Sequence, residues 1–328
     1  MATMTMVESI RHTLFQEMAR DERVMVFGED VGANGGVFRA TEGLQARFGA
    51  DRVYDTPLSE AVIIGAAYGL AMAGLVPVPE IQFLGFTQQA FHQIYGQIAR
   101  LRYRSNGRFD CPVTIRAPFG GGVRTPELHS DSMEAIYAQV PGLKVVCPAS
   151  AADAKGLLAS AIRDPDPVLF LEPLRGYRMI RDEVPAGDHL VALGKARQVS
   201  DGTDLVIISW SAMVEVSRKA AEQVAADTGA SVGVLDLRSI VPLDVEAIVS
   251  AVERAGRAVV VQESALTAGF AAEVIATIQE ECFYSLEAPV RRVSGWDVPY
   301  PVGMLEDYYV PDAARVAAAV RQTLETAS

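Results

Sequence analysis

Short runs rich in valine, isoleucine and leucine alternate with longer helical stretches along the whole chain. Such alternation is typical of α/β domains, in which helices cover a mostly parallel sheet. It predicts two doubly wound sheets. The expected strands cover residues 24–28, 76–82, 113–116, 143–146, 168–171, 205–209, 232–236, 258–261 and 290–293. The expected helices lie near residues 4–20, 60–73, 86–104, 151–163, 212–227, 243–254, 268–283 and 311–325.

A polar, turn-rich stretch from Glu172 to Gly194 separates the two halves and is expected to be a linker. It contains several prolines and glycines, which interrupt regular structure. A length of 328 residues also fits roughly two domains. We therefore predict one α/β domain over residues 1–185 and a second over residues 186–328.

Composition excludes several classes of function. A net charge of −12 argues against a nucleic-acid partner, because such binding depends on basic surface. No stretch reaches the roughly 18 consecutive apolar residues of a membrane span, and the N-terminal residues lack the pattern of a signal peptide. The cysteines are few and lack metal-ligand spacing, which indicates a reducing compartment. A cytoplasmic protein without a membrane partner is expected.

A single acid, Glu60, stands at the start of a helical stretch that is almost wholly apolar. The segment Asp55-Thr-Pro-Leu-Ser-Glu60 leads into Ala-Val-Ile-Ile-Gly-Ala-Ala-Tyr-Gly-Leu-Ala-Met. A helix that is apolar on all sides is expected to be buried, and a buried carboxyl needs a partner or a raised pKa. Glu60 is then suited to exchange a proton with a ligand. The alternative is an ordinary first-turn acid, favoured by the helix dipole.

Motifs of the commoner α/β enzymes are absent from the sequence. The chain has no G-x-G-x-x-G dinucleotide fingerprint, no phosphate-binding P-loop and no G-x-S-x-G nucleophile turn. The glycine-rich stretch 28–36 follows an expected strand, but its spacing differs from the dinucleotide fingerprint. The sequence therefore disfavours a nicotinamide-dependent enzyme, a nucleoside triphosphatase and a serine hydrolase.

A series of motifs instead resembles one known family. They occur in the order Gly28-Glu-Asp-Val-Gly32, Gly35-Gly-Val-Phe38, Asp55-Thr-Pro-Leu-Ser-Glu60, Glu80-Ile-Gln-Phe83, Leu101-Arg-Tyr-Arg-Ser105, Gly120-Gly-Gly-Val123, Pro141-Gly-Leu-Lys-Val-Val146, Ala154-Lys-Gly-Leu157 and Asp236-Leu-Arg238. From about residue 4 to 325 the chain resembles β subunits of the E1 component of 2-oxo acid dehydrogenase complexes, which depend on thiamine diphosphate. The resemblance implies a transketolase-like fold, with a pyrimidine-binding domain followed by a transketolase C-terminal domain.

The resemblance implies cofactor contacts for four residues. Glu60 matches the family glutamate that bonds N1′ of the aminopyrimidine, so that the exocyclic nitrogen can take the C2 proton of the thiazolium. Leu58 and Gln82 are expected beside the same ring, and Phe86 is expected to pack against its face. A purely structural place in the core is the alternative for Phe86, and it is preferred for Phe83 and Phe91.

His129 is the expected second catalytic residue. It lies in Gly120-Gly-Gly-Val-Arg-Thr-Pro-Glu-Leu-His-Ser130, a loop without apolar periodicity, and loops often carry function. The resemblance implies that His129 orients or protonates the 2-oxo acid and assists transfer to the lipoyl group, a role suited to its pKa near neutrality. Arg124 on the same loop either meets the substrate carboxylate or anchors the loop.

The resemblance also implies a structural cation, usually potassium. The matching positions are Val113, Ala161, Ile162, Asp164 and Asp166. Backbone carbonyls and carboxylates are the hard oxygen donors that such ions prefer. This chain has Asp166 where asparagine is common, which leaves a divalent ion open. An ordinary Asp-Pro turn is the alternative interpretation.

The absence of one further motif predicts a partner. Thiamine diphosphate enzymes hold the diphosphate through Mg²⁺ and a Gly-Asp-Gly motif, which this chain lacks. The resemblance implies that an E1 α subunit supplies it in an α2β2 heterotetramer, which acts with the E2 dihydrolipoyl acyltransferase. Glu306 and Asp307 are candidate E2-docking acids. Pyruvate is the favoured substrate; a branched-chain 2-oxo acid and acetoin are alternatives, as is a non-catalytic binding subunit.

Overall fold

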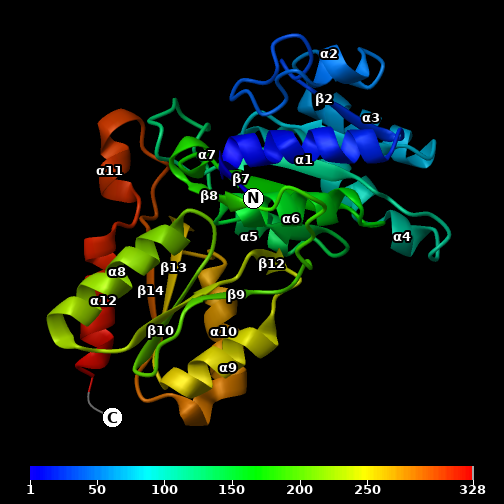
Figure 1. Ribbon diagram of the computed structural model, residues 1–328. Coiled ribbons are helices and arrows are strands. Elements are labelled where there is room, and N and C mark those ends of the chain that lie inside the picture. Colours follow the sequence, from blue (N-terminus) through cyan, green and yellow to red (C-terminus); the bar gives the residue numbers. More distant parts are fainter. Residues whose placement is uncertain (327–328) are drawn as a thin grey trace.

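The computed structural model describes residues 1–326 and contains two large sheets, as the alternating pattern predicted (Figure 1). The first sheet has seven strands. All neighbouring strands in it are parallel except the pair at the β12 edge, which is antiparallel. In spatial order the strands are β12 (Ser239–Val241), β6 (Lys144–Val146), β7 (Val168–Pro173), β5 (Thr114–Phe119), β4 (Val76–Glu80), β2 (Val24–Gly28) and β3 (Val53–Asp55).

The second sheet has five strands and belongs to the C-terminal half. Its strands in spatial order are β14 (Arg291–Gly295), β13 (Ala258–Ala265), β10 (Leu205–Ser209), β11 (Val232–Asp236) and β9 (Arg197–Ser200). Only β9 runs antiparallel to its neighbour. A small third sheet pairs β1 (Ala2–Thr5) with β8 (Arg181–Val184). The boundary between the two domains at residues 185/186 stays a prediction.

Helices cover both faces of the two sheets. In the first half they are α1 (Met6–Arg20), α2 (Leu44–Phe48), α3 (Glu60–Met72), η1 (Leu84–Ala90), η2 (Gln93–Ile98), α4 (Leu101–Arg104), α5 (Glu134–Ala138), α6 (Ala151–Ile162) and α7 (Gly176–Met179). In the second half they are α8 (Met213–Thr228), α9 (Val245–Ala255), α10 (Ala271–Cys282), η3 (Phe283–Ser285), η4 (Gly303–Leu305), α11 (Glu306–Tyr309) and α12 (Ala313–Leu324). In Figure 1, α8 and α12 lie on one side of the five-stranded sheet, and α9 and α10 lie on the other. No helix within residues 1–326 is both long enough and apolar enough to cross a bilayer.

Local signals explain where the main helices begin and end. Thr5 caps α1, and the Glu8 carboxylate accepts the backbone N–H of Thr5, which completes a capping box. Ser150 and Asp244 accept backbone N–H groups at the starts of α6 and α9. Helix α9 ends at Gly256, whose left-handed backbone suits glycine. These caps account for the close agreement between the expected and observed helix bounds.

Strand β4 runs through the middle of the sheet although it contains Pro77 and Pro79. Proline lacks the N–H that a central strand donates to its neighbour. The sheet tolerates both prolines because β4 pairs fully only with β2, while its ladder with β5 is limited to Glu80 and Arg116. The pairing thus begins where the prolines end, at the carboxyl end of the strand.

Two expectations about local structure were wrong, and one strand pairing was not expected. The single helix expected at 86–104 is broken into the 3-10 helix η1, the π-helix η2 and the short α4. The expected linker 172–194 contains the helix α7 and the strand β8, because β8 finds a partner in the N-terminal strand β1. Strand β12 follows the linker but joins the first sheet beside β6. None of these pairings has a local sequence signal.

Candidate active site

The predicted site residues follow neighbouring strands of the seven-stranded sheet. Strand β2 lies between β3 and β4, and Gly28 at its end is in register with Asp55 and with Glu80. Strand β5 continues the order on the other side of β4. Glu60 follows β3, Gln82 and Phe86 follow β4, and His129 follows β5. The carboxyl ends of parallel strands are where open α/β sheets bind ligands, so the topology gathers these residues at one edge.

Glu29 is a member of this edge that the sequence-based interpretation missed. Its side chain is only 4% exposed, and within residues 1–326 its Oε1 has no hydrogen-bond partner. Burial, followed by the negative charges of Glu60 and Asp30, raises the pKa of Glu29 to about 7. Two carboxyls, Glu29 and Glu60, therefore lie close enough to influence each other. The sequence feature that could have identified Glu29 is its position directly after an expected buried strand.

Backbone contacts fix the segment that carries Glu29. The Asp55 carboxylate accepts the N–H of Gly32 at 2.6 Å and that of Ala33 at 3.2 Å. At Gly28, whose φ is +153°, an added Cβ would lie 2.4 Å from the Glu80 carbonyl oxygen, so only glycine allows the two strand ends to approach. These contacts hold Glu29 against the β3 and β4 ends.

Gln82 contacts the segment that carries Glu29, whereas Leu58 and Glu60 are more exposed to solvent. Gln82 Nε2 donates to Asp30 Oδ2 at 3.1 Å. Glu60 is half-buried at the first turn of α3, and Leu58 is 84% exposed. The helix expected to be buried on all sides instead exposes one apolar face in the single chain, with Val62 62% exposed. Only the opposite face packs in the core.

His129 lies against the aromatic residues that follow β4. Its ring centroid is 4.5 Å from that of Phe83 and 4.9 Å from that of Phe86. Phe83 is buried, as expected of a core residue, whereas Phe86 is half-buried. The fold thus joins Phe86 and His129, which are far apart in sequence. The sequence implied that Phe86 and His129 are close only because both were assigned to the same active site.

The loop that carries His129 is itself seated on the β4–η1 turn. A Cβ at Gly85 would lie 2.1 Å from the Leu128 carbonyl oxygen, so the missing side chain makes room for the loop. His129 Nδ1 donates to the Glu127 carbonyl oxygen at 2.9 Å. Because that bond places the proton on Nδ1 in the neutral ring, Nε2 remains the acceptor nitrogen.

Contacts of Arg124 and Glu306 bear on two of the expectations. Arg124 Nη2 pairs with Asp307 Oδ2 at 2.7 Å, which fits loop anchoring, while a contact with the substrate carboxylate stays a prediction. Glu306, a candidate for E2 docking, is only 2% exposed. Its carboxylate accepts the N–H groups of Gly122 and Arg124. The docking hypothesis was wrong for Glu306 because a buried, fully engaged carboxylate offers nothing to a partner.

The five candidate cation ligands lie at the end of α6 and the start of β5. Val113 accepts the Val168 N–H at 2.9 Å, and Asp164 donates its N–H to the Ala161 carbonyl at 3.2 Å, while Ile162 is the last residue of α6. The Asp164 carboxylate accepts Lys144 Nζ at 2.6 and 2.7 Å.

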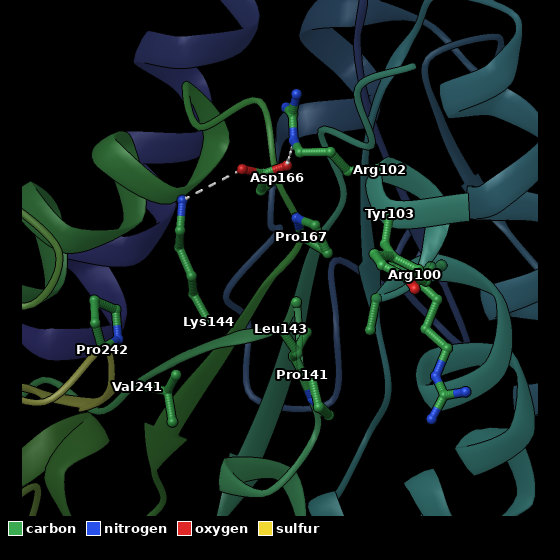
Figure 2. A pocket seen from close by; sticks show the side chains of 13 residues that line it. Arg100, Arg102, Tyr103, Pro141, Leu143, Lys144, Asp166, Pro167, Val241 and Pro242 are labelled. Atoms are coloured by element: carbon green, nitrogen blue, oxygen red, sulfur yellow. Dashed lines mark hydrogen bonds and ion pairs between the residues drawn. The ribbon is translucent and has the colours of Figure 1, made fainter. Parts of the chain in front are cut away.

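Figure 2 shows the Asp166 carboxylate between Arg102 and Lys144. Asp166 also lines an open groove of about 670 Å³. Both acids are thus already balanced by cationic side chains, and residues 1–326 contain no cluster of three metal-binding His, Cys, Asp or Glu residues. A potassium ion at this place, held by backbone carbonyls, stays a prediction.

A buried ionic cluster supports the carboxyl ends of β4, β5 and β7. Arg116 is fully buried and bonds Glu80 Oε2 through Nη1 at 2.7 Å. Its Nε and Nη2 bond the two Glu172 oxygens at 2.7 and 3.0 Å. Tyr177 donates its hydroxyl to the same Glu172 carboxylate. Sequence reasoning missed this cluster because its members come from three different strands and one helix.

The raised pKa of Glu29 predicts a pH-dependent effect of Glu29→Gln. A pKa raised from 4.5 to about 7 in the folded chain means that Glu29 contributes stability below about pH 4.5, which is lost as the pH rises through about 7. Thermal unfolding of the chain between about pH 5 and pH 8 should therefore show Glu29→Gln gaining in midpoint over the wild type with rising pH. A constant difference across that range would contradict the raised pKa.

Comparisons with known proteins agree with this geometry. Residues 2–179 match the family model "Transketolase, pyrimidine binding domain", and residues 194–316 match "Transketolase, C-terminal domain". The chain is 54% identical to the pyruvate dehydrogenase E1 component subunit beta of Bacillus subtilis, over 99% of this chain and 100% of the relative. The corresponding subunit of Staphylococcus epidermidis is 53% identical over the same shares.

Solved structures show the same fold at low sequence identity. A split-gene transketolase, described as an inactive β4 tetramer, superposes with a TM-score of 0.81 at 23% identity and covers 99% of each chain. Transketolase from Leishmania mexicana gives a TM-score of 0.70 at 17% identity, over 99% of this chain and 46% of the other. With two family models and full-length relatives above half identity in agreement, the chain belongs to the family of pyruvate dehydrogenase E1 component β subunits, built from transketolase pyrimidine-binding and C-terminal domains.

Proposed function

We propose that this chain is the β subunit of a thiamine diphosphate-dependent E1 component that oxidatively decarboxylates pyruvate and acylates the lipoyl group of E2. The observation that carries the proposal is that Glu60, Phe86 and His129 follow the carboxyl ends of β3, β4 and β5, which lie with β2 in one run of four adjacent strands. The names of its full-length relatives favour pyruvate over a branched-chain 2-oxo acid or acetoin.

The residues at this edge fit the aminopyrimidine end of the cofactor. A half-buried phenylalanine offers a ring face for stacking, and Glu60 offers a carboxyl beside the buried Glu29. When bound, thiamine diphosphate supplies the carbon nucleophile and the electron sink that decarboxylation of a 2-oxo acid requires. Glu60 would hold or release a proton at the pyrimidine N1′, beside Glu29, whose pKa is raised by burial and by the negative charge of Glu60.

His129 acts on the substrate side of the same site. Its Nδ1 proton is engaged by the Glu127 carbonyl, so Nε2 is free to accept a hydrogen bond or a proton. Phe83 and Phe86 hold the ring from one side. A histidine fixed in this way can orient a 2-oxo acid and can exchange a proton with the lipoyl sulfur.

The exposed face of α3 is the proposed contact with the E1 α subunit. It is formed by Val62, Ala66 and Gly69, with Leu58 just before the helix, and all four residues are exposed in the single chain. Small residues let another helix approach closely, and an apolar face at the rim of a site favours a protein partner. An α subunit seated there would close the site over Glu60 and would supply Mg²⁺ and the diphosphate contacts. We therefore infer an α2β2 heterotetramer.

The test is reconstitution of this chain with its α chain. The complex should decarboxylate pyruvate with an artificial electron acceptor, and it should act less well on 3-methyl-2-oxobutanoate and acetoin. Preference for either of these would move the substrate assignment to that compound. A correctly assembled complex that acts on none of the three would favour a non-catalytic binding subunit.

The role of His129 predicts that His129→Ala separates two steps. Thiamine diphosphate should bind with an unchanged Kd, because the proposed cofactor contacts follow β3 and β4, whereas His129 follows β5. Acylation of lipoyl groups should fall by about 10²-fold, the scale of a positioned acid or base. Isothermal titration of the cofactor and an E2 acylation assay provide the two readouts. Normal acylation in this variant would remove His129 from the mechanism.

A further inference from the structure

The loop between β5 and α5 is held in an unusual backbone conformation. Gly120, Gly122, Arg124 and Leu128 all have positive φ values, of 74°, 102°, 54° and 66°. A positive φ is costly for arginine and leucine and persists only where the surroundings impose it. Some other part of the molecule must therefore fix this loop, which carries His129 at its far end.

The C-terminal half provides the restraints, through side chains far away in sequence. Glu263, near the end of β13, accepts the Gly121 N–H at 2.5 Å and the Tyr300 hydroxyl at 2.8 Å. Glu306, the first residue of α11, accepts the Gly122 N–H at 2.6 Å and the Arg124 N–H at 3.2 Å. Figure 1 shows α11 beside the green loop near α7. Consecutive loop amides are thus bound by two carboxylates.

Both carboxylates are buried and leave no room for side chains on the loop. Glu263 is 6% exposed and Glu306 is 2% exposed. A Cβ at Gly121 would lie 2.1 Å from the Tyr300 hydroxyl oxygen and 2.9 Å from the Glu306 carboxyl carbon. The glycines therefore allow the backbone itself to approach the acids, which is closer than any side-chain contact would permit. Such charge-assisted bonds are short and specific in direction.

We propose that Glu306 is a positioning residue, through which the C-terminal domain sets the conformation of the 120–130 loop and so the place of His129. Glu263 and Tyr300 form the second restraint, and the exposed Arg124–Asp307 pair adds a weaker one. The inference rests on the proposed role of His129. According to this proposal, α11 contributes to the active site through Glu306, although α11 belongs to the C-terminal half.

The first test measures the loop directly in the reconstituted complex by amide hydrogen exchange. Glu306→Ala leaves two buried N–H groups without an acceptor, so exchange at residues 121–130 should accelerate by about tenfold or more. Exchange in β10 and β13 should stay at the wild-type rate. Glu306→Gln keeps one acceptor oxygen and should give a smaller effect. Loop exchange unchanged in Glu306→Ala would overturn the proposal, and exchange raised throughout the chain would reduce Glu306 to a general stabilising residue.

The second test asks whether the loop conformation matters for the reaction. In Glu306→Ala, the KM for pyruvate should rise and kcat/KM should fall by about tenfold, with partial rescue by Glu306→Gln. Glu253→Ala removes an exposed acid from α9, at the far end of the C-terminal half in Figure 1, and is the matched control. Faster loop exchange with unchanged kinetics would overturn the link to His129. An inactive wild-type complex would refute the proposed function alone, because the exchange measurement still reports on the Glu306 contacts.

Discussion

Glu60→Gln should abolish nearly all activity of the reconstituted complex while leaving the fold intact. Glutamine keeps the size of the side chain but cannot exchange a proton, and a positioned acid or base is worth about 10²-fold or more. The fold should survive because Glu60 is only half-buried, at the start of a helix, and the substitution keeps the size of the side chain. The decarboxylation rate with pyruvate and an artificial electron acceptor is the measurement.

A second readout of the same variant does not depend on activity. Glu60 is one of the charges that raise the pKa of Glu29. Removing it should lower that pKa, so the fall in wild-type stability as the pH rises through about 7 should become shallower. Glu22→Gln, at the amino end of β2 and away from the site, is the matched control. Full activity in Glu60→Gln would remove the central assignment of the mechanism.

Much of the site could be predicted because its members follow strands with clear local signals. The apolar runs at 24–28 and 113–116 and the capped helix starts identify the strand ends, and parallel strands place those ends at one edge. Topology therefore places Glu60 and His129 at the same edge of the sheet. The resemblance added which chemistry each residue performs, and the full-length relatives agree with that family.

Contacts between distant segments could not be predicted from the sequence. Glu306 looks like a solvated surface acid by its neighbours in sequence, and only the fold brings it to amides more than a hundred residues earlier. The pKa of Glu29 depends on burial and on Glu60, neither of which is visible in the motif Gly28-Glu-Asp-Val. The exposed apolar face of α3 could not be predicted for another reason. An apolar helix face has the same composition whether it is covered by this chain or by a partner.

The buried Arg116 cluster gives the largest expected effect on stability. Arg116→Met would leave Glu80 and Glu172, both buried, without the only arginine that bonds them among residues 1–326. Removing one partner of a buried ion pair costs about 3–5 kcal/mol, because the remaining charge stays out of water. The thermal midpoint of the first domain should fall on the order of 10 °C.

The dependence on pH and a compensated variant separate charge from packing. Burial, followed by the negative charge of Glu172, raises the pKa of Glu80, and without Arg116 no positive charge opposes that rise. The loss of stability should therefore be smallest in acid, where Glu80 is protonated, and should grow as the pH rises. The triple variant Arg116→Met, Glu80→Gln, Glu172→Gln carries no buried charge and should recover at least half of the lost midpoint at neutral pH. If single and triple variants unfold at the same temperature, the cluster stabilises the strand ends by packing and hydrogen bonding, and its charges contribute little.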